Sequence, residues 1–275
     1  MLNHKETWRL IQSPPAQGAL NMAMDDTLLE SVMQGTSEPI LRLYRWNPAC
    51  LSLGYAQPIS DIDRARLKEH NWDLVRRPTG GRAILHTDEL TYAVILPIGH
   101  PLSRGGVLPS YQRISTGLIQ ALQLLGLEVT VQPSVQLNDV ERTEPVCFKI
   151  PSSYEITVAG KKLLGSAQVR RKGAVLQHGT LPLQGEIRRI CDALAFPKAA
   201  DRELAKQRVQ QRAGTVSDLL DQHVTWDQAA QAIQQGFAKV FEIQFTTSDP
   251  TQEEMARCQT LQKERYQDEA WIARL

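Results

Sequence analysis

The stretch RRPTGGRAILHTDELTYAVI, at residues 76–95, carries the strongest structural signal in the 275-residue chain. It ends in the most apolar segment of the sequence, residues 90–98, and a short apolar run is typical of a buried strand. It begins where a short predicted strand, residues 73–76, meets a proline and a glycine pair that indicate a loop. A glycine pair directly after a strand lets backbone N–H groups approach a ligand closely. The stretch therefore predicts a core strand preceded by a ligand-binding loop or by an ordinary turn with surface arginines.

The segments on both sides of this stretch predict an α+β, or mixed α/β, fold. Residues 40–46 alternate apolar and basic side chains, as a half-buried strand does. Further strands are predicted at residues 8–11, 50–54, 127–131, 154–158, 162–169 and 174–183. Helices are predicted at residues 16–32, at 61–70 with Asp61 as the N-cap, and at 111–125. After residue 184 the pattern is mostly helical, with a brief strand at 242–245, so a helical tail follows the region of strands.

Composition narrows the class of protein. Apolar residues make up 42% and charged residues 22% of the chain, which is typical of a globular protein with a large core. The 31 basic and 30 acidic residues argue against a general nucleic-acid-binding protein. No stretch reaches the roughly 20 apolar residues of a membrane span, and the polar residues 1–9 predict no secretory signal. The four cysteines form no CxxC pair, so we expect no metal site and a cytoplasmic protein with reduced thiols.

A second informative segment covers residues 145–180. It holds six basic residues against a single acid, a local net charge of six minus one, or +5. It also contains Cys147, Lys162 and His178. A thiol becomes a nucleophile when its thiolate is stabilised, and an ammonium within about 4–6 Å lowers a pKa by roughly 1–3 units. Cys147 is therefore a candidate nucleophile, although by composition alone a cysteine is more often an inert thiol. The remaining cysteines lie in apolar or helical patterns and are expected to be structural: Cys50, Cys191 and Cys258.

Together the two segments resemble a known superfamily. RRPTGGRAILH followed by DELTYAVI resembles the substrate loop of the biotin/lipoate ligases and lipoyl transferases, and CFKIPSSYEITVAGKKLLGSAQVRRKGAVLQHGTL, at 147–181, resembles their central segment. The opening pattern Cys-x-x-x-Pro-Ser-x-Tyr-Glu is similar to that of octanoyltransferases. The resemblance implies a ligase-like catalytic domain with a central, mostly antiparallel sheet flanked by helices. We expect this domain at residues 1–245, with a core at about 34–245, and a C-terminal helical extension at 246–275.

The resemblance also implies roles for particular residues. It assigns the acyl-thioester nucleophile to Cys147, and to Lys162 the contact with the acyl carbonyl and the lowering of the cysteine pKa. It matches the substrate-loop positions to Arg77, Gly80, Gly81 and His86. It matches the acyl-pocket strands to Gly165, Ser166, Ala167, His178 and Gly179. In two places the chain departs from the ligase pattern: Arg82 stands where many ligases have a third glycine, and Thr87, followed by Asp88, stands where an aspartate usually follows the histidine.

The implied reaction transfers an octanoyl group from acyl carrier protein to a lysine of a lipoyl domain or of the glycine-cleavage H protein. Thioester exchange is nearly balanced and amide formation is favourable, so no cofactor is expected. A basic rim formed by the segment at 145–180 would steer acidic carrier domains toward the site, unless these side chains are merely solvated hairpin residues. No nucleic-acid or membrane partner is expected.

Four alternatives remain open from the sequence. An ATP-dependent lipoate–protein ligase would share the fold and Lys162 but not depend on Cys147, and the chain is short for a ligase with a full accessory domain. An amidotransferase would move lipoyl or octanoyl groups from H protein to other lipoyl domains, also through a cysteine. A thiol hydrolase would use His178 as the base for Cys147. A non-catalytic module would only bind carrier proteins.

Overall fold

The predicted core strand is β6 (Glu89–Pro97), and it lies inside a six-stranded sheet. The computed structural model describes residues 5–133 and 154–275. The strand order is β10 (Gly165–Arg171), β11 (Ala174–Pro182), β6, β2 (Ile40–Tyr44), β1 (Thr7–Gln12) and β12 (Gln244–Thr247). The pairs β10–β11, β11–β6 and β6–β2 are antiparallel, whereas β1 runs parallel to β2 and to β12. The mostly antiparallel central sheet is therefore confirmed.

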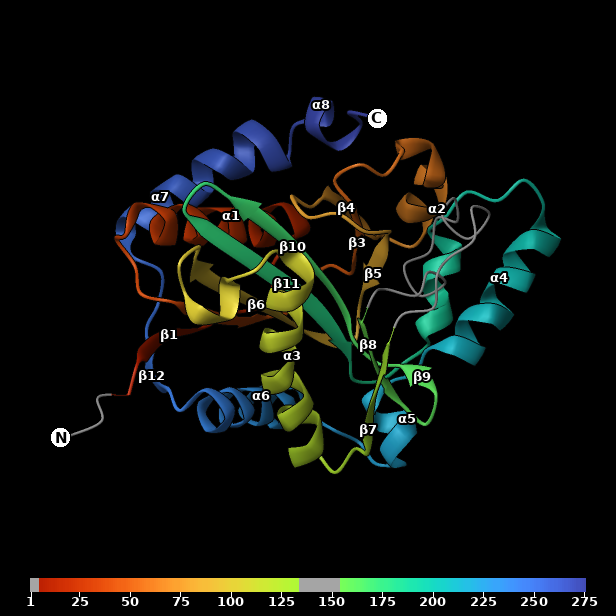
Figure 1. Cartoon of the computed structure of the whole chain (residues 1–275). Coiled ribbons are helices and arrows are strands. Elements are labelled where there is room, and N and C mark those ends of the chain that lie inside the picture. Colours follow the sequence, from red (N-terminus) through yellow and green to blue (C-terminus); the bar gives the residue numbers. More distant parts are fainter. Residues whose placement is uncertain (1–4, 134–153) are drawn as a thin grey trace.

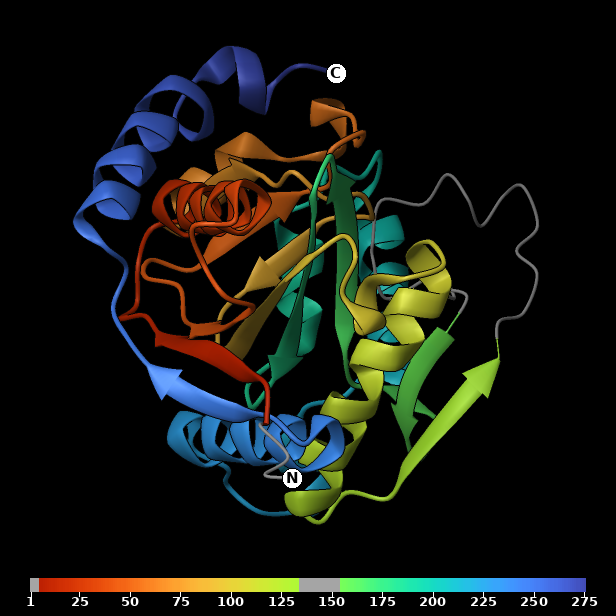
Figure 2. The ribbon, with the colours of Figure 1, turned by 60° about the vertical axis from the view of Figure 1, so that its left-hand side comes forward.

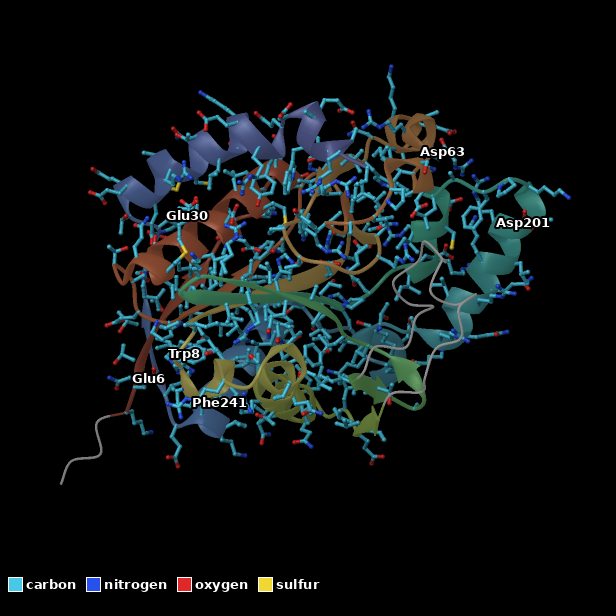
Figure 3. The ribbon with its side chains drawn as sticks, turned by 45° about the horizontal axis from the view of Figure 1, so that its top comes forward. Glu6, Trp8, Glu30, Asp63, Asp201 and Phe241 are labelled. Atoms are coloured by element: carbon cyan, nitrogen blue, oxygen red, sulfur yellow. The ribbon has the colours of Figure 1, made fainter. Side chains whose placement is uncertain are left out.

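Helices cover both faces of this sheet (Figure 1). Helix α1 (Gly18–Gln34) packs on one face, and α3 (Val107–Leu124) and α6 (Trp226–Phe241) pack on the other. The alternation along β6 divides its side chains between the two cores: Tyr92 and Val94 join the α3/α6 core, whereas Ala93 and Ile95 join the α1 core. On β1, Trp8 also faces the α3/α6 core and stacks on Phe241 (Figure 3).

Two small sheets flank one end of the central sheet. One contains β4 (Asp73–Arg76), β3 (Cys50–Leu53) and β5 (Ile84–His86), and the other contains β7 (Val129–Pro133), β8 (Tyr154–Val158) and β9 (Lys161–Lys162). The chain passes from β5 into β6 and from β9 into β10 within a few residues. Because β6 and β10 both begin at this end and β11 ends there, segments distant in the sequence meet at one edge of the fold.

The remaining helices are short and peripheral. They are η1 (Ile59–Asp61), α2 (Arg64–Glu69), η2 (Pro101–Ser103), η5 (Ile187–Asp192), α4 (Ala199–Arg212), α5 (Val216–Leu220), α7 (Gln252–Leu261), the π-helix η6 (Gln262–Tyr266) and α8 (Glu269–Ile272). Figure 2 shows α7 lying beside α1, where the Nε of Arg257 donates a hydrogen bond of 2.6 Å to Glu30. No helix in residues 5–133 and 154–275 is long and apolar enough to cross a membrane.

Two details differ from the predicted elements. The helix expected at 61–70 begins at Arg64, and its N-cap is Asp63 rather than Asp61, because the Asp63 carboxylate accepts a hydrogen bond from the Arg66 backbone N–H. The strand expected at 162–169 divides into β9 and β10. Lys162 pairs with Thr157, and the next two residues are buried leucines that take the chain from β9 into β10 of the central sheet.

Candidate active site

A pocket lies on the α1 face of the central sheet, at the end where β6 and β10 begin. Its lining is mainly apolar with a few polar groups, as is usual for sites that bind small ligands. Eight of the predicted site residues line it: Arg77, Gly81, His86, Gly165, Ser166, Ala167, His178 and Gly179. Seven further residues complete the lining: Met22, Tyr44, Trp46, Ser52, Ile84, Thr91 and Thr180. The structure thus brings together two segments that are almost 80 residues apart in the sequence.

Strands β10 and β11 form the floor of the pocket. In their antiparallel register Gly165 lies opposite Thr180, and Ala167 lies opposite His178. Small residues keep this floor low, and at Gly179 no side chain fits. A Cβ there would lie 2.6 Å from the Gly165 carbonyl oxygen, which is closer than van der Waals contact allows. That Cβ would point toward Tyr92 on the other face of the sheet, so it is Gly165 and Ala167 that leave room in the pocket, and we call this room the slot.

The predicted substrate loop, residues 77–82, forms the opposite wall and is held by Arg77. The Arg77 guanidinium donates hydrogen bonds to the carbonyl oxygens of Ser52, Gly80 and Arg82, at 2.9, 2.8 and 2.7 Å. Gly81 adopts a φ of 92°, in the left-handed region that favours glycine. Gly80 belongs to the same turn but does not line the pocket. Arg77 therefore holds the substrate loop in its conformation. The sequence predicted only that Arg77 belongs to this loop.

His178 lies in a buried chain of hydrogen bonds between a carboxylate and a hydroxyl. Its Nδ1 is 2.9 Å from the Oδ2 of Asp25 on α1, and its Nε2 is 2.7 Å from the Oγ1 of Thr79 in the substrate loop. Burial lowers the pKa of His178 below its ordinary value, although contact with the Asp25 carboxylate opposes this. A neutral imidazole donates from Nδ1 to the carboxylate and accepts the Thr79 hydroxyl proton at Nε2. His178 therefore connects α1, β11 and the substrate loop.

Asp25 is completely buried and remains ionised because of its neighbours. Burial raises its pKa, but the charge of Arg42, at 2.7 Å, and the hydrogen bond from His178 outweigh this effect, so the pKa lies below the ordinary value. The Tyr44 hydroxyl donates a further hydrogen bond of 2.9 Å to Asp25. The adjacent Asp26 binds instead to Arg265 and Tyr266 of the C-terminal tail. The two aspartates thus serve different partners, as expected for neighbours on a helix.

His86 lies in a second chain of the same kind. Its Nδ1 is 2.7 Å from the Oε1 of Glu89, and its Nε2 is 2.7 Å from the Ser52 hydroxyl. The ring stacks on Trp46 with 4.0 Å between centroids, and the Trp46 N–H donates to the Thr91 hydroxyl. The carboxylate that accompanies this histidine is therefore Glu89, three residues further on, rather than the residue next to it.

Two positions that depart from the ligase pattern lie outside the pocket. Asp88 forms an ion pair with Arg189 and lines an adjacent hollow together with Thr87. The Arg82 carbonyl oxygen accepts a hydrogen bond from the Arg77 guanidinium, whereas the Arg82 guanidinium lies 4.0 Å from the Asp61 carboxylate. Neither departure changes the lining of the slot.

Of the two proposed catalytic residues, the structure describes only Lys162. Cys147 lies outside the described residues. Lys162 is buried on β9, three residues before Gly165, and is not among the residues that line the pocket. The basic residues at the other end of β10, Arg170 and Arg171, bind the Ser103 carbonyl and Asp26. Seven residues of strand put them about 20 Å from Gly165, so these two do not form a rim at the pocket.

Sequence reasoning missed the residues that support the site from other elements. Asp25 carried no signal, because its partner His178 is 153 residues away. Thr79 and Thr180 stand inside the quoted motifs but had no assigned role. Among residues 5–133 and 154–275, no group of three or more His, Cys, Asp or Glu side chains is arranged to hold a metal ion.

Comparisons with known proteins agree with this geometry. The family model of the lipoyl protein ligase A/B catalytic domain matches residues 17–238. The octanoyltransferase LipM of Staphylococcus epidermidis is 38% identical over 98% of this chain and 99% of its own, and that of Bacillus subtilis is 37% identical over 97% and 98%.

Solved structures of lipoate protein ligases share the fold of this chain over nearly its whole length. A bipartite lipoate protein ligase of Thermoplasma acidophilum superposes with a TM-score of 0.81 at 25% identity, covering 98% of this chain and 97% of the other. A lipoate-protein ligase A bound with ATP gives 0.79 at 26% identity, covering 98% and 100%. The chain therefore belongs to the lipoyl protein ligase A/B catalytic domain family and, within it, to the octanoyltransferases LipM.

Proposed function

We propose that this protein is an octanoyltransferase, which moves an octanoyl group from acyl carrier protein to a lysine of a lipoyl domain or of glycine-cleavage H protein. The observation that carries the proposal is the slot formed by β10, β11 and the substrate loop in a chain whose nearly full-length relatives are named LipM. The described cysteines Cys50, Cys191 and Cys258 form no disulfide, which supports a reducing, cytoplasmic location as part of this proposal.

The slot suits an acyl chain. Met22, Trp46, Ile84 and Ala167 contribute apolar surface to its lining. Each methylene group transferred from water to such surface gains about 0.8 kcal/mol, so eight carbons gain several kcal/mol before the cost of ordering the chain. The polar side chains of the lining are largely engaged with one another, which leaves the slot free for an apolar guest.

The choice of nucleophile rests on the other three cysteines. Cys50, Cys191 and Cys258 are each buried with no exposed surface. Burial raises the pKa of Cys50 well above its ordinary value and that of Cys258 to about 11. Because the thiolate is the nucleophilic form, these thiols are unsuited to attack a thioester, and Cys147 is the candidate that remains.

The transfer takes two steps that balance without a cofactor. The Cys147 thiolate attacks the carbonyl carbon of the octanoyl thioester, a new C–S bond forms, and the carrier's thiolate leaves and takes up a proton. The acceptor amine then attacks the acyl-enzyme, the C–N bond forms, the Cys147 C–S bond breaks, and the amine proton passes to the thiolate. Lys162 stabilises the thiolate and the developing oxyanion in this scheme.

An ATP-dependent lipoate ligase is the second candidate, because the superposed structures include ligases. The length of the chain does not separate the two functions, since the ATP-bound ligase chain is covered completely by this one. This comparison does not test whether the chain is short for a ligase with a full accessory domain, which stays a prediction. The two functions differ in their need for ATP and for Cys147.

Intact-mass spectrometry after incubation with octanoyl-acyl carrier protein, without ATP, tests the proposal. We expect an octanoyl adduct that disappears in Cys147→Ser and persists in Cys258→Ala, whose thiol is buried. Transfer to a lipoyl domain should follow, and Lys162→Ala should move the iodoacetamide reactivity of Cys147 to higher pH. Product formed only with ATP and free octanoic acid would instead establish the ligase, and octanoyl-H protein as the only effective donor would establish the amidotransferase.

A further inference from the structure

Thr180 differs from the other hydroxyl-bearing residues around the pocket. Its side chain is 1% exposed, and its Oγ1 has no hydrogen-bond partner among the described residues. The other hydroxyls in the lining are all engaged: Ser52 with His86, Thr91 with Glu89 and Trp46, and Ser166 with the Tyr92 hydroxyl. A buried hydroxyl without a partner costs free energy, and because Thr180 lines the pocket, a ligand group there can supply the missing bond.

The position of Thr180 is where a reacting carbonyl is expected. Thr180 lies on β11 directly opposite Gly165, at the end of the floor nearest to β9, which carries Lys162. Together with Ile84 it lines both the acyl slot and the adjacent, more polar hollow that contains Asp88. If an acyl chain lies in the slot with its carbonyl end at Thr180 and Ile84, a reactant that enters through the polar hollow reaches the carbonyl at these two residues.

The other polar side chains at this end of the floor are committed elsewhere. Both ring nitrogens of His178 are engaged, one with Asp25 and one with Thr79. The Ser166 hydroxyl is 2.7 Å from the Tyr92 hydroxyl, which also accepts from Gln177. Thr180 therefore presents the unengaged hydroxyl proton of the described lining.

We propose that the Thr180 hydroxyl is a catalytic donor, which binds the carbonyl oxygen of the acyl group and stabilises the oxyanion formed during transfer. This inference rests on the proposed octanoyl transfer and adds a residue to it. Because the donor is buried and already placed, its bond to the oxygen strengthens as negative charge develops there.

Two substitutions separate the hydroxyl from the shape of the side chain. Thr180→Val keeps the shape and removes the donor, whereas Thr180→Ser keeps the donor. We expect Thr180→Val to lower kcat for octanoyl transfer about 10²-fold with a much smaller change in KM, as removal of one oxyanion donor does. Thr180→Ser should stay within several-fold of the wild type. Equal kcat values for Thr180→Val and the wild type would overturn the proposal.

Thermal stability shows whether the hydroxyl has only a structural role. Thr180→Val should unfold at the same temperature as the wild type or higher, because it removes a buried group that has no partner. The matched control is Thr91→Val on β6, directly opposite Thr180. It should unfold at a lower temperature, because its hydroxyl bonds to Trp46 and Glu89. A fall in melting temperature for Thr180→Val as large as that for Thr91→Val would contradict the inference.

A binding experiment keeps this test separate from that of the proposed function. Octanamide with a ¹³C-labelled carbonyl does not react, and its infrared stretching frequency reports the hydrogen bond to the carbonyl. The frequency in the bound state should be lower in the wild type and Thr180→Ser than in Thr180→Val. Identical frequencies, or no binding to the wild type, would reject the role of Thr180 whether or not the protein transfers octanoyl groups.

Discussion

The two histidines of the pocket each lie between a carboxylate and a hydroxyl, but they differ in how far along the sequence the carboxylate lies. In the first chain, Asp25–His178–Thr79, the partners lie 153 and 99 residues from the histidine. In the second, Glu89–His86–Ser52, the carboxylate is only three residues away. The first set of hydrogen bonds connects a helix, the central sheet and the substrate loop, whereas the second joins His86 at the end of β5 to Glu89 at the start of β6 and to Ser52 on the neighbouring strand β3, 34 residues away. The carboxylate is thus a distant partner in the first set and a local one in the second.

The two carboxylates differ in charge balance as well as in connectivity. Asp25 accepts a hydrogen bond from the buried guanidinium of Arg42, so it belongs to a buried ion pair. The oxygen of Glu89 that faces His86 accepts instead from the neutral hydroxyl of Thr91. Loss of one partner of a buried ion pair leaves an uncompensated charge, which is much more costly than loss of a neutral hydrogen bond. The first chain should therefore contribute more to stability than the second.

Removal of each carboxylate gives the largest expected difference. Asp25→Ala leaves Arg42 buried without its anion and should lower the free energy of unfolding by about 3–5 kcal/mol. Glu89→Ala should lower it by about 1–3 kcal/mol, because the His86 ring and the Thr91 hydroxyl lose their acceptor and no buried guanidinium is left without an anion. Urea denaturation followed by circular dichroism measures both values.

A third variant calibrates that measurement. Glu30 pairs with Arg257 at the surface of α1, and Glu30→Ala should change the free energy of unfolding by less than about 1 kcal/mol (Figure 3). If Asp25 is too destabilised to fold as alanine, Asp25→Asn keeps its shape and removes only the charge. Equal losses for the Asp25 and Glu89 variants would show that the two chains are equivalent braces.

A substitution in the slot should have a smaller effect, which concerns the preferred length of the acyl chain. A Cβ at Gly165 would lie 3.6 Å from the Thr180 methyl group and 3.7 Å from the Ile84 side chain, which is ordinary contact. Gly165→Ala should therefore fold normally but shorten the slot at its Thr180 end, so that an acyl chain with its carbonyl there must lie about one methylene group further along the slot. Octanoyl transfer should fall several-fold relative to hexanoyl transfer, since about one methylene group, worth about 0.8 kcal/mol, loses its place.

The measurement is kcat/KM for hexanoyl and octanoyl donors compared in the variant and the wild type. Gly80→Ala is the matched control, because a Cβ there has no neighbour within 4 Å and Gly80 does not line the pocket. It should leave the ratio of the two donors unchanged. An unaltered ratio in Gly165→Ala would mean that the acyl chain does not lie along β10.

The contrast between the two chains also explains what the sequence could predict. The apolar run at residues 90–98 predicted β6, and alternation predicted β2, but β2 is buried along its whole length rather than half-buried, Arg42 included. The turn at Ala159–Gly160, where both residues have positive φ, pairs Lys162 with Thr157 within one hairpin. These signals are local. The Asp25–His178 contact is a product of tertiary packing, and nothing near either residue indicates it.

The proposed catalytic residues lie beyond what local sequence signals could place. Cys147 and Lys162 were proposed from resemblance, and their contact stays a prediction because Cys147 lies outside the described residues. Thr180 stands inside a quoted motif, yet its lack of a hydrogen-bond partner is a property of the folded structure. Motifs therefore placed the pocket, but only the fold shows how its hydroxyls differ.

The smallest expected effect is a pH dependence of stability that arises from His178 in the Asp25–His178–Thr79 set of hydrogen bonds. Burial holds the pKa of His178 below its ordinary value of 6.5, and the neighbouring Arg77 and His86 side chains lower it further, against the opposing effect of Asp25. The unfolded chain therefore binds more protons than the folded one just below pH 6.5. The stability from this group is complete above that pH and is lost as the pH falls toward the folded pKa.

His178→Gln should remove this part of the pH dependence, which melting temperatures between pH 5 and 7.5 measure. Thr79→Val is the matched control, because it removes the partner at Nε2 but keeps the imidazole beside Asp25, so its slope should resemble that of the wild type. A wild-type slope in His178→Gln would mean that another group titrates. In that case His178 would hold the substrate loop equally well in its charged form, and the comparison with His86 would rest on connectivity alone.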